Sequence, residues 1–256
     1  MNQITDTFYD DMASAYHLIF ADWDATIMQQ GEVLSALLPV PELAGKVLDC
    51  ACGIGTQALG LAGRGYQVEG SDLSAAEIER ARQEAGKRGL HIPFRTDDMR
   101  LLHTSVAGAY GVVLACDNAL PHLDSNDEVD LALAAMYRSL RPGGKLMLSL
   151  RDYGPLMAQR PGMMPAAMFM DDGRRRIVHQ VWDWQDERRY IVHLYITCQM
   201  SELAWTTSHF SGRYRAITPM EVAARASHAG YEQVQVLLPE ATGYYQPIVA
   251  ALRPAT

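Results

Sequence analysis

The feature that most constrains the fold of this chain is the segment Lys46–Gln57, KVLDCACGIGTQ. A short apolar run ends at Asp49, and Gly53 and Gly55 separate it from a segment that can form a helix. Glycines at such a junction let a ligand approach the backbone, and the first turn of the next helix offers unpaired N–H groups. The pattern predicts a strand, a tight turn that can hold a ligand, and a helix over Thr56–Ala62.

The same alternation of strand and helix continues as far as residue 151. Capping-box patterns at Ser74–Glu77 and Ser125–Glu128 mark the starts of two more helices. Further strands are expected at 67–71, 92–98, 110–118 and 145–151, with an RPGG turn before the last. This alternation predicts a parallel sheet with helices on both faces, and ligands of such sheets bind at the carboxyl ends of the strands. Polar residues stand at those ends: Asp49, Asp72, Asp97, Asp98, Asp117, Asn118 and Arg151.

The amino-acid composition of the sequence changes after residue 151. Residues 152–173 are rich in proline, glycine and methionine and are expected to form a loop. Three antiparallel strands are expected at 175–184, 188–200 and 203–217. Thr218 and the proline after it start a further helix, and two strands at 232–238 and 246–252 follow. The pattern indicates an antiparallel insertion in an alternating domain.

Composition narrows the class of protein. The 256 residues suggest one large domain or one domain with an insertion. A net charge of −8 without a basic face argues against a nucleic-acid partner. The N-terminus is unlike a signal peptide, and no apolar run reaches the roughly 20 residues of a membrane span, so no membrane partner is expected. Four cysteines without a second ligand pair predict no metal site and suit packing in a reducing cytoplasm.

The chemistry of the glycine turn depends on the acid that ends the next strand. Asp72 lies about twenty residues after the turn, where an acid commonly accepts hydrogen bonds from ribose hydroxyls. Leu59 and Gly60 do not complete a G-x-G-x-x-G motif, which favours a nucleoside without pyrophosphate over a dinucleotide. Asp49 could accept from an ammonium group or hold the loop together. Without Asp72, the glycines would fit an ordinary strand–helix turn equally well.

Arg151 ends the fifth expected strand, beside the ligand site. An arginine fork fits a carboxylate with two hydrogen bonds, so Arg151 is a candidate for binding an acidic group of a substrate. A salt bridge to Asp152 or another acid is the alternative. Tyr9, Tyr16 and Trp23 near the N-terminus could attract a cation through their ring faces, or simply pack on the domain at helical spacing.

Several segments resemble the successive motifs of class I S-adenosylmethionine-dependent methyltransferases: VLDCACGIGTQ, VEGSDLS, DDMR, DNALPHL and LRPGGKLMLSLRDY. YHLIFADWD, RDY and YYQPIVAALR are similar to N-methyltransferases of the glycine/sarcosine type. The resemblance implies an α/β fold: a Rossmann-like sheet, mostly parallel with an antiparallel C-terminal strand, plus the antiparallel insertion. It implies a lid at 1–30, a domain at 31–151 and 216–256 that binds S-adenosyl-L-methionine, and an insertion at 152–215 that contributes to the substrate pocket.

The resemblance also assigns roles to single residues. Asp72 would hold the ribose hydroxyls, and Asp98, or Asp97 in its place, would accept from the adenine amino group. His122 would line the transfer site, although a structural hydrogen-bonded histidine explains it equally well. The set implied for the cofactor is Tyr16, Trp23, Asp49, Ala51, Gly53, Gly55, Asp72, Leu73, Asp98, Met99 and Asn118; for catalysis His122, Asn118 and Arg151; and for the substrate Arg151, Tyr153 and Tyr214.

The implied activity is methyl transfer to the amine of a small molecule, with glycine or sarcosine as the expected acceptor. Such a transfer is an in-line displacement that positioning can accelerate, so no dedicated general base is required. The alternatives are an O- or C-methyltransferase of a small secondary metabolite, and a non-catalytic cofactor-binding subunit of a partner enzyme. A cytoplasmic enzyme is expected, with a homo-oligomer left open.

Overall fold

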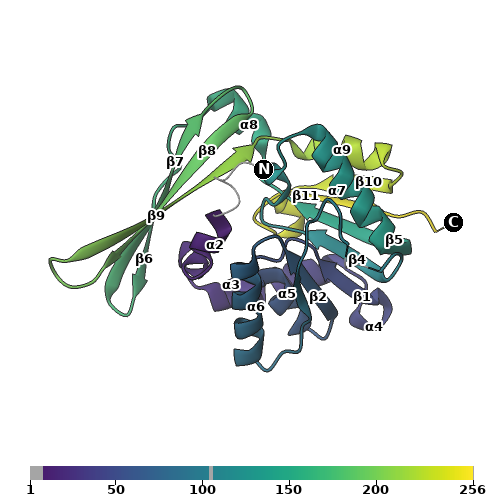
Figure 1. Ribbon diagram of the computed structural model, residues 1–256, viewed down its shortest axis with the longest axis horizontal. Coiled ribbons are helices and arrows are strands. Elements are labelled where there is room, and N and C mark those ends of the chain that lie inside the picture. The colour runs from purple at the N-terminus through teal and green to yellow at the C-terminus, as the bar shows by residue number, and fades with distance from the viewer. Residues whose placement is uncertain (1–7, 104–105, 256) are drawn as a thin grey trace.

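The computed structural model describes residues 8–103 and 106–255, which form two β-sheets and the helices packed on them (Figure 1). The larger sheet has seven strands in the order β10-β11-β5-β4-β1-β2-β3. Strands β1 to β5 are parallel, whereas β11 is antiparallel to both β5 and β10. The expected mostly parallel sheet with an antiparallel C-terminal strand is therefore confirmed. The bounds are β1 Lys46–Asp49, β2 Gln67–Asp72, β3 Phe94–Thr96, β4 Tyr110–Ala115, β5 Leu140–Ser149, β10 Glu232–Leu237 and β11 Ile248–Leu252.

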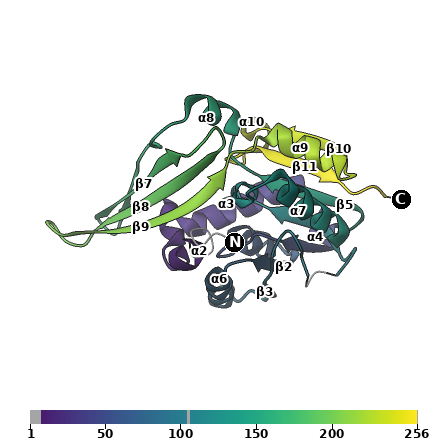
Figure 2. The ribbon, with the colours of Figure 1, turned by 45° about the horizontal axis from the view of Figure 1, so that its top comes forward.

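Helices cover both faces of this sheet (Figures 1 and 2). One apolar core contains side chains of α3 (Trp23–Leu37), α5 (Thr56–Ala62) and α6 (Ala75–Lys87). The other contains side chains of α7 (Asn126–Ser139) and α9 (Pro219–His228). Helices α3 and α5 cross at two glycines, since a Cβ added to Gly31 would lie 2.6 Å from the backbone carbonyl of Gly60. This crossing fixes the helix that begins at the glycine turn. The short helices α4 (Pro41–Ala44) and α10 (Pro239–Thr242) lie in connections.

The smaller sheet is antiparallel and extends away from the larger one (Figure 1). Its strands are β6 (Ala167–Asp171), β7 (Arg174–Trp184), β8 (Arg189–Gln199) and β9 (Trp205–Arg215), which confirms the antiparallel insertion. The N-terminal segment, with α2 (Phe8–Met12) and the 3₁₀ helix η1 (Tyr16–Ile19), lies between the two sheets (Figures 1 and 2). There, Phe8 and Met12 share an apolar cluster with side chains of β7 and β8, namely Val178, Leu194 and Ile196.

Two expectations about local structure are wrong. The expected loop at 152–173 contains helix α8 (Tyr153–Gln159) and strand β6. Asp152 caps α8 by accepting from the Gly154 N–H, and β6 forms through its pairing with β7, which its own composition does not signal. The RPGG segment lies inside β5, which begins at Leu140, and not before that strand.

The predicted capping boxes differ in how far they form. Ser74 and Ser125 cap their helices, but Glu77 does not bond back to Ser74, and Glu128 accepts from the Asp124 N–H. At α9 the reciprocal box between Thr218 and Glu221 is complete. Within the described residues, every helix falls short of the length and apolar character that crossing a bilayer requires.

Candidate functional site

A cavity of about 380 Å³ lies at the carboxyl ends of β1 to β4. The order of the strands reverses between β1 and β4, and ligands of open α/β sheets bind at such a switch point. We call this space the strand-end cavity. Its walls include Ala51, Gly53, Asp72, Leu73, Glu77, Asp97, Asp98, Met99, Asp117 and His122.

The glycine turn and Asp72 build one part of this cavity together. Gly53 has φ of +51°, a left-handed conformation that glycine adopts without strain. Its N–H donates to Asp72 Oδ2 at 2.9 Å, and the Ser74 N–H donates to Asp72 Oδ1 at 3.0 Å. An ionised carboxylate offers about four acceptor positions, so about two remain for hydroxyl groups of a ligand. Asp72 therefore both holds the turn and keeps acceptor capacity.

Glu77 is a cavity-lining acid that the sequence indicated only as a helix cap. It is 1% exposed, and its Oε1 has no hydrogen-bond partner among the described residues. Burial, together with the nearby charges of Asp72 and Asp10, raises the pKa of the Glu77 carboxyl well above its ordinary value. The Ser74 N–H is already bonded to Asp72, so the carboxyl of Glu77 is left on the cavity wall.

Asp97, Asp98 and Met99 form the wall that follows β3. Arg100 holds the Asp98 carboxylate, with its Nη2 2.5 Å from Asp98 Oδ2, and also pairs with Glu128. Asp97 is buried and accepts from the Asp98 N–H at 2.9 Å. Both carboxylates thus line the cavity.

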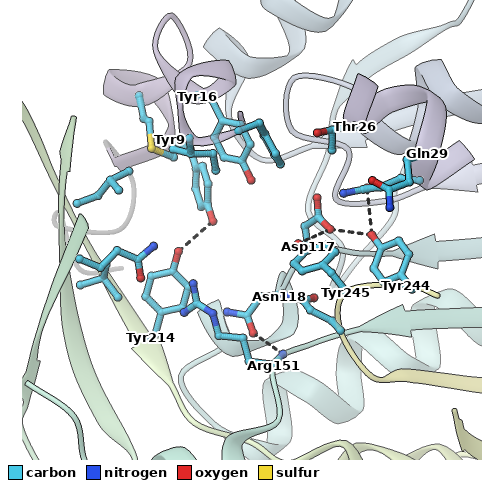
Figure 3. A pocket seen from close by; sticks show the side chains of 18 of the residues that line it. Tyr9, Tyr16, Thr26, Gln29, Asp117, Asn118, Arg151, Tyr214, Tyr244 and Tyr245 are labelled. Carbon is cyan, nitrogen blue, oxygen red and sulfur yellow. Dashed lines mark hydrogen bonds between the residues drawn. The ribbon is translucent and has the colours of Figure 1, made fainter. Parts of the chain in front are cut away.

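A second cavity, of about 420 Å³, lies between the N-terminal segment, strands β7 to β9 and the loop before β11 (Figure 3). We call it the tyrosine cavity, because five tyrosines line it: Tyr9, Tyr16, Tyr214, Tyr244 and Tyr245. Asn118 and Arg151 lie on the same wall in Figure 3. Tyr9, Tyr16 and Asp117 line both cavities, so these three side chains form the boundary between them.

Tyr9 links the N-terminal segment to the strand-end residues. Its hydroxyl lies 2.6 Å from His122 Nε2 and 3.4 Å from the Tyr214 hydroxyl. Burial lowers the pKa of His122 to about 3, so the imidazole is neutral near neutral pH. Burial also raises the pKa of the Tyr9 hydroxyl well above its ordinary value. Tyr9, His122 and Tyr214 therefore form an uncharged chain of hydrogen bonds at the boundary of the two cavities.

Arg151 places its guanidinium among aromatic rings of the insertion. The guanidinium carbon lies 5.1 Å from the ring centre of Trp182 and 5.9 Å from that of Tyr214, and Nη1 donates to the Tyr190 hydroxyl at 3.4 Å. None of the described carboxylates forms an ion pair with Arg151, so the alternative of a salt bridge to Asp152 is not observed. A cation in this setting can bind an anionic group in the tyrosine cavity.

Not every residue implied by the resemblance lies at a cavity wall. Four of these residues line neither cavity: Trp23, Asp49, Gly55 and Tyr153. Trp23 belongs to α3, where its Nε1–H donates to Thr56 Oγ1, and Asp49 is fully buried beneath the turn. The Tyr153 hydroxyl accepts from Asn118 Nδ2 at 3.0 Å, so Tyr153 supports a wall residue. Nothing in the sequence indicated that Gln57 belongs to the site. In the structure Gln57 lies on α5 and its Nε2 donates to Asp117 Oδ2 at 2.6 Å.

Comparison with known proteins is consistent with this geometry. Residues 47–144 match the methyltransferase domain family. The glycine/sarcosine N-methyltransferase of Halorhodospira halochloris is 29% identical over 140 residues, which are 53% of this chain and 50% of that protein. The ubiquinone biosynthesis O-methyltransferase of Bordetella avium is 31% identical over 121 residues, 45% of this chain and 48% of that protein. This chain thus spans about half the length of the curated relatives it matches.

A solved structure resembles nearly the whole chain. The S-adenosylmethionine-bound amino pentose methyltransferase of Micromonospora echinaspora has a TM-score of 0.73 at 23% identity, and the match covers 94% of this chain and 95% of that one. At this identity the likeness establishes the fold alone.

Proposed function

We propose that this chain, which belongs by its domain and fold to the class I S-adenosylmethionine-dependent methyltransferases, methylates the amine of a small molecule that carries a carboxylate. Glycine or sarcosine is the first acceptor to test. The observation that carries the proposal is the adjacency of two cavities with a shared boundary, where the tyrosine cavity contains Arg151, an arginine that none of the described carboxylates pairs with.

The residues of the strand-end cavity fit S-adenosyl-L-methionine. Asp72 keeps acceptor positions for ribose hydroxyls, Leu73 and Met99 offer apolar contact for adenine, and the Gly53 turn admits a ligand close to the backbone. When bound, this cofactor supplies a methyl group on a sulfonium, an electrophile that a neutral amine can attack. Tyr9 and Tyr16 at the boundary would present their rings to positive charge.

The protein's own contribution to the reaction is positioning. Arg151 would fix the acceptor carboxylate by two hydrogen bonds, and Asn118 accepts from the Arg151 N–H at 3.2 Å and so holds the backbone of that residue. Holding the amine in line with the methyl group can remove several kcal/mol of the barrier. The N-terminal segment would act as a lid over this site, and the insertion would provide the outer wall of the pocket.

A second candidate acceptor is an amine larger than glycine, such as an amino sugar. The volume of the tyrosine cavity, about 420 Å³, falls within the range of cavities that hold drug-sized ligands. The solved relative named an amino pentose methyltransferase matches this fold over 94% of this chain.

Methyl transfer by the purified protein over a panel of glycine, sarcosine, larger amino acids, amino sugars and hydroxy acids tests the proposal. Transfer to an amine supports it, transfer only to oxygen or carbon indicates the O- or C-methyltransferase, and binding without transfer to any acceptor indicates the non-catalytic subunit.

Arg151 gives the sharpest prediction about the acceptor. Arg151→Lys keeps the charge but loses the fork, so kcat/KM for an amino acid should fall through both KM and kcat. Arg151→Ala should lose roughly 2–4 kcal/mol in kcat/KM, because the guanidinium lies among buried rings. Steady-state kinetics measure both, and calorimetry should show unchanged binding of S-adenosylhomocysteine. Lost cofactor binding, with normal discrimination between an amino acid and its amide, would contradict the assignment.

A further inference from the structure

A carboxylate stands where the two cavities meet. Asp117 follows β4 and lines both the strand-end cavity and the tyrosine cavity. It has φ of +56°, and Asn118 after it has φ of +71°, two consecutive left-handed conformations at non-glycine residues. Such conformations persist only where surrounding contacts enforce them, and here Ser149 accepts from both N–H groups, through Oγ at 2.8 Å and through its carbonyl at 3.1 Å. The backbone thus fixes Asp117 at the boundary.

The hydrogen-bond partners of this carboxylate are all neutral. Oδ1 accepts from the hydroxyls of Tyr244 and Tyr245, each at 2.7 Å, and Oδ2 accepts from Gln57 Nε2 at 2.6 Å (Figure 3 shows the tyrosines). The side chain of Gln30 also hydrogen-bonds the carboxylate. Within the described part of the chain no arginine, lysine or histidine pairs with Asp117, so its negative charge has no cationic partner there.

From this geometry, and resting on the proposed function, we infer that Asp117 binds an N–H of the acceptor amine. The acceptor nitrogen then lies at the boundary, and Arg151 in the same cavity takes the opposite, anionic end of the molecule. An acceptor that satisfies both groups carries a carboxylate and a primary or secondary amine. The amine keeps an N–H for Asp117 until its last methylation.

The carboxylate also suits the movement of charge during transfer. The nitrogen lone pair forms the new N–CH₃ bond while the S–CH₃ bond breaks and its electron pair stays on sulfur. Positive charge therefore leaves sulfur, which becomes a neutral thioether, and appears on nitrogen, which keeps its proton until the product reaches water. A fixed anion beside the nitrogen stabilises that developing charge more strongly than a neutral amide at the same place.

The alternative is a purely structural role, in which Asp117 only ties α5 to the loop before β11. Asp117→Asn distinguishes the two, because Asn Oδ1 can still accept hydrogen bonds while the negative charge is gone. With the best acceptor amine of the wild-type protein, kcat/KM should fall by roughly 10- to 150-fold, the size of a lost hydrogen bond to a charged group. The S-adenosylhomocysteine affinity and the Tm should change little. Asp127→Asn, the same change at an exposed acid of α7, is the matched control.

A second readout separates amine recognition from other roles. The quaternary trimethyl analogue of the acceptor carries a fixed positive charge but has no N–H, so as an inhibitor it should bind the wild-type protein more weakly than the amine, and Asp117→Asn should narrow this difference. Asp117→Glu, which keeps the charge but moves it, should lower kcat more than it raises KM, and it serves if the Asn variant does not fold. If Asp117→Asn retains kcat/KM within about twofold, or weakens S-adenosylmethionine binding instead, the inference is wrong while amine methylation stands. If the wild-type protein methylates no amine, the proposed function itself fails.

Discussion

At the scale of single residues, the site is characterised by three carboxylates that no described arginine or lysine pairs with: Asp72, Glu77 and Asp117. Asp72 and Asp117 accept hydrogen bonds from neutral groups around them, and Glu77 Oε1 has no hydrogen-bond partner among the described residues. In a folded protein such groups are unfavourable unless a ligand completes them. They are therefore better guides to the ligand sites than the glycine turn alone.

Asp72→Ala tests the ribose contact. The variant should weaken S-adenosylhomocysteine binding by roughly 1–3 kcal/mol, because ribose hydroxyls lose a charged acceptor. Since Asp72 also accepts from the Gly53 N–H, the Tm should fall as well. Asp72→Asn, which keeps one acceptor oxygen, should lose less of both. Calorimetry and thermal unfolding measure the two effects, and an unchanged affinity in Asp72→Ala would remove the ribose assignment.

His122 gives a prediction for pH. Its pKa of about 3 in the folded protein is below the roughly 6.5 of an unfolded chain. Between these values the unfolded state binds more protons, so the free energy of unfolding falls as pH drops from about 6.5 towards 3. His122→Gln, which still offers an amide to Tyr9, should lose less stability between neutral and mildly acidic pH than the wild type. Urea unfolding at both pH values measures this, with the exposed His228→Gln as control; parallel losses in all three proteins would refute it.

At the scale of elements, hydrogen bonds join the N-terminal segment to α6 on one side and to β7 on the other. Asp10 of α2 accepts from Ser74 Oγ at 2.5 Å and from the Ala76 N–H at 3.2 Å, at the N-terminus of α6. On the other side, the buried Arg176 of β7 donates to the Phe20 carbonyl at 3.0 Å and pairs with Asp171. The predicted lid boundary at residue 30 falls inside α3, which packs on α5. The proposed lid is therefore confined, among the described residues, to the part before α3.

Asp10→Ala tests this attachment. The loss of a helix-capping interaction costs about 0.5–2 kcal/mol, so the segment between α2 and α3 should be cleaved faster in limited proteolysis, and S-adenosylhomocysteine should protect it less. Asp11→Ala changes the neighbouring exposed acid and should behave like the wild type. Cleavage that is equally fast with and without saturating S-adenosylhomocysteine in the wild type would remove the lid from the proposal.

At the scale of the whole molecule, charge is concentrated where the cofactor would enter. The chain carries a net charge of −8, and the strand-end cavity is lined by acids: Asp72, Glu77, Asp97, Asp98, Asp117, Asp124 and Glu128. Arg100, which pairs with Asp98 and Glu128, also lines this cavity, so the acids remain in excess. A cavity with an excess of one sign of charge concentrates ligands of the opposite sign, and salt screens this attraction. S-adenosylmethionine has a sulfonium charge that S-adenosylhomocysteine lacks. Raising the salt concentration should therefore weaken binding of S-adenosylmethionine more, and an equal loss for both ligands in calorimetry would contradict this.

Elements with local signals could be predicted from the amino-acid sequence. Val47 and Leu48 form a buried strand because they are apolar, Gly53 turns because it tolerates a left-handed φ, and Ser74 and Thr218 start helices because their side chains cap the first N–H groups. The same signals predicted that Asp72 and Arg151 stand at strand ends, near a ligand site.

Contacts between side chains that are distant in sequence became visible in the folded chain alone. Asp117 joins Gln57 and Tyr244, residues 60 and 127 positions away, and no periodicity or motif encodes such a contact. Strand β6 likewise exists because β7 offers backbone partners, while its own composition suggests a loop. The side chain of Trp23 is buried and does not line a cavity, because α3 places it beside Thr56. Pairing of strands and burial of side chains are properties of the assembled chain, since their free energy comes from partners that are distant in sequence.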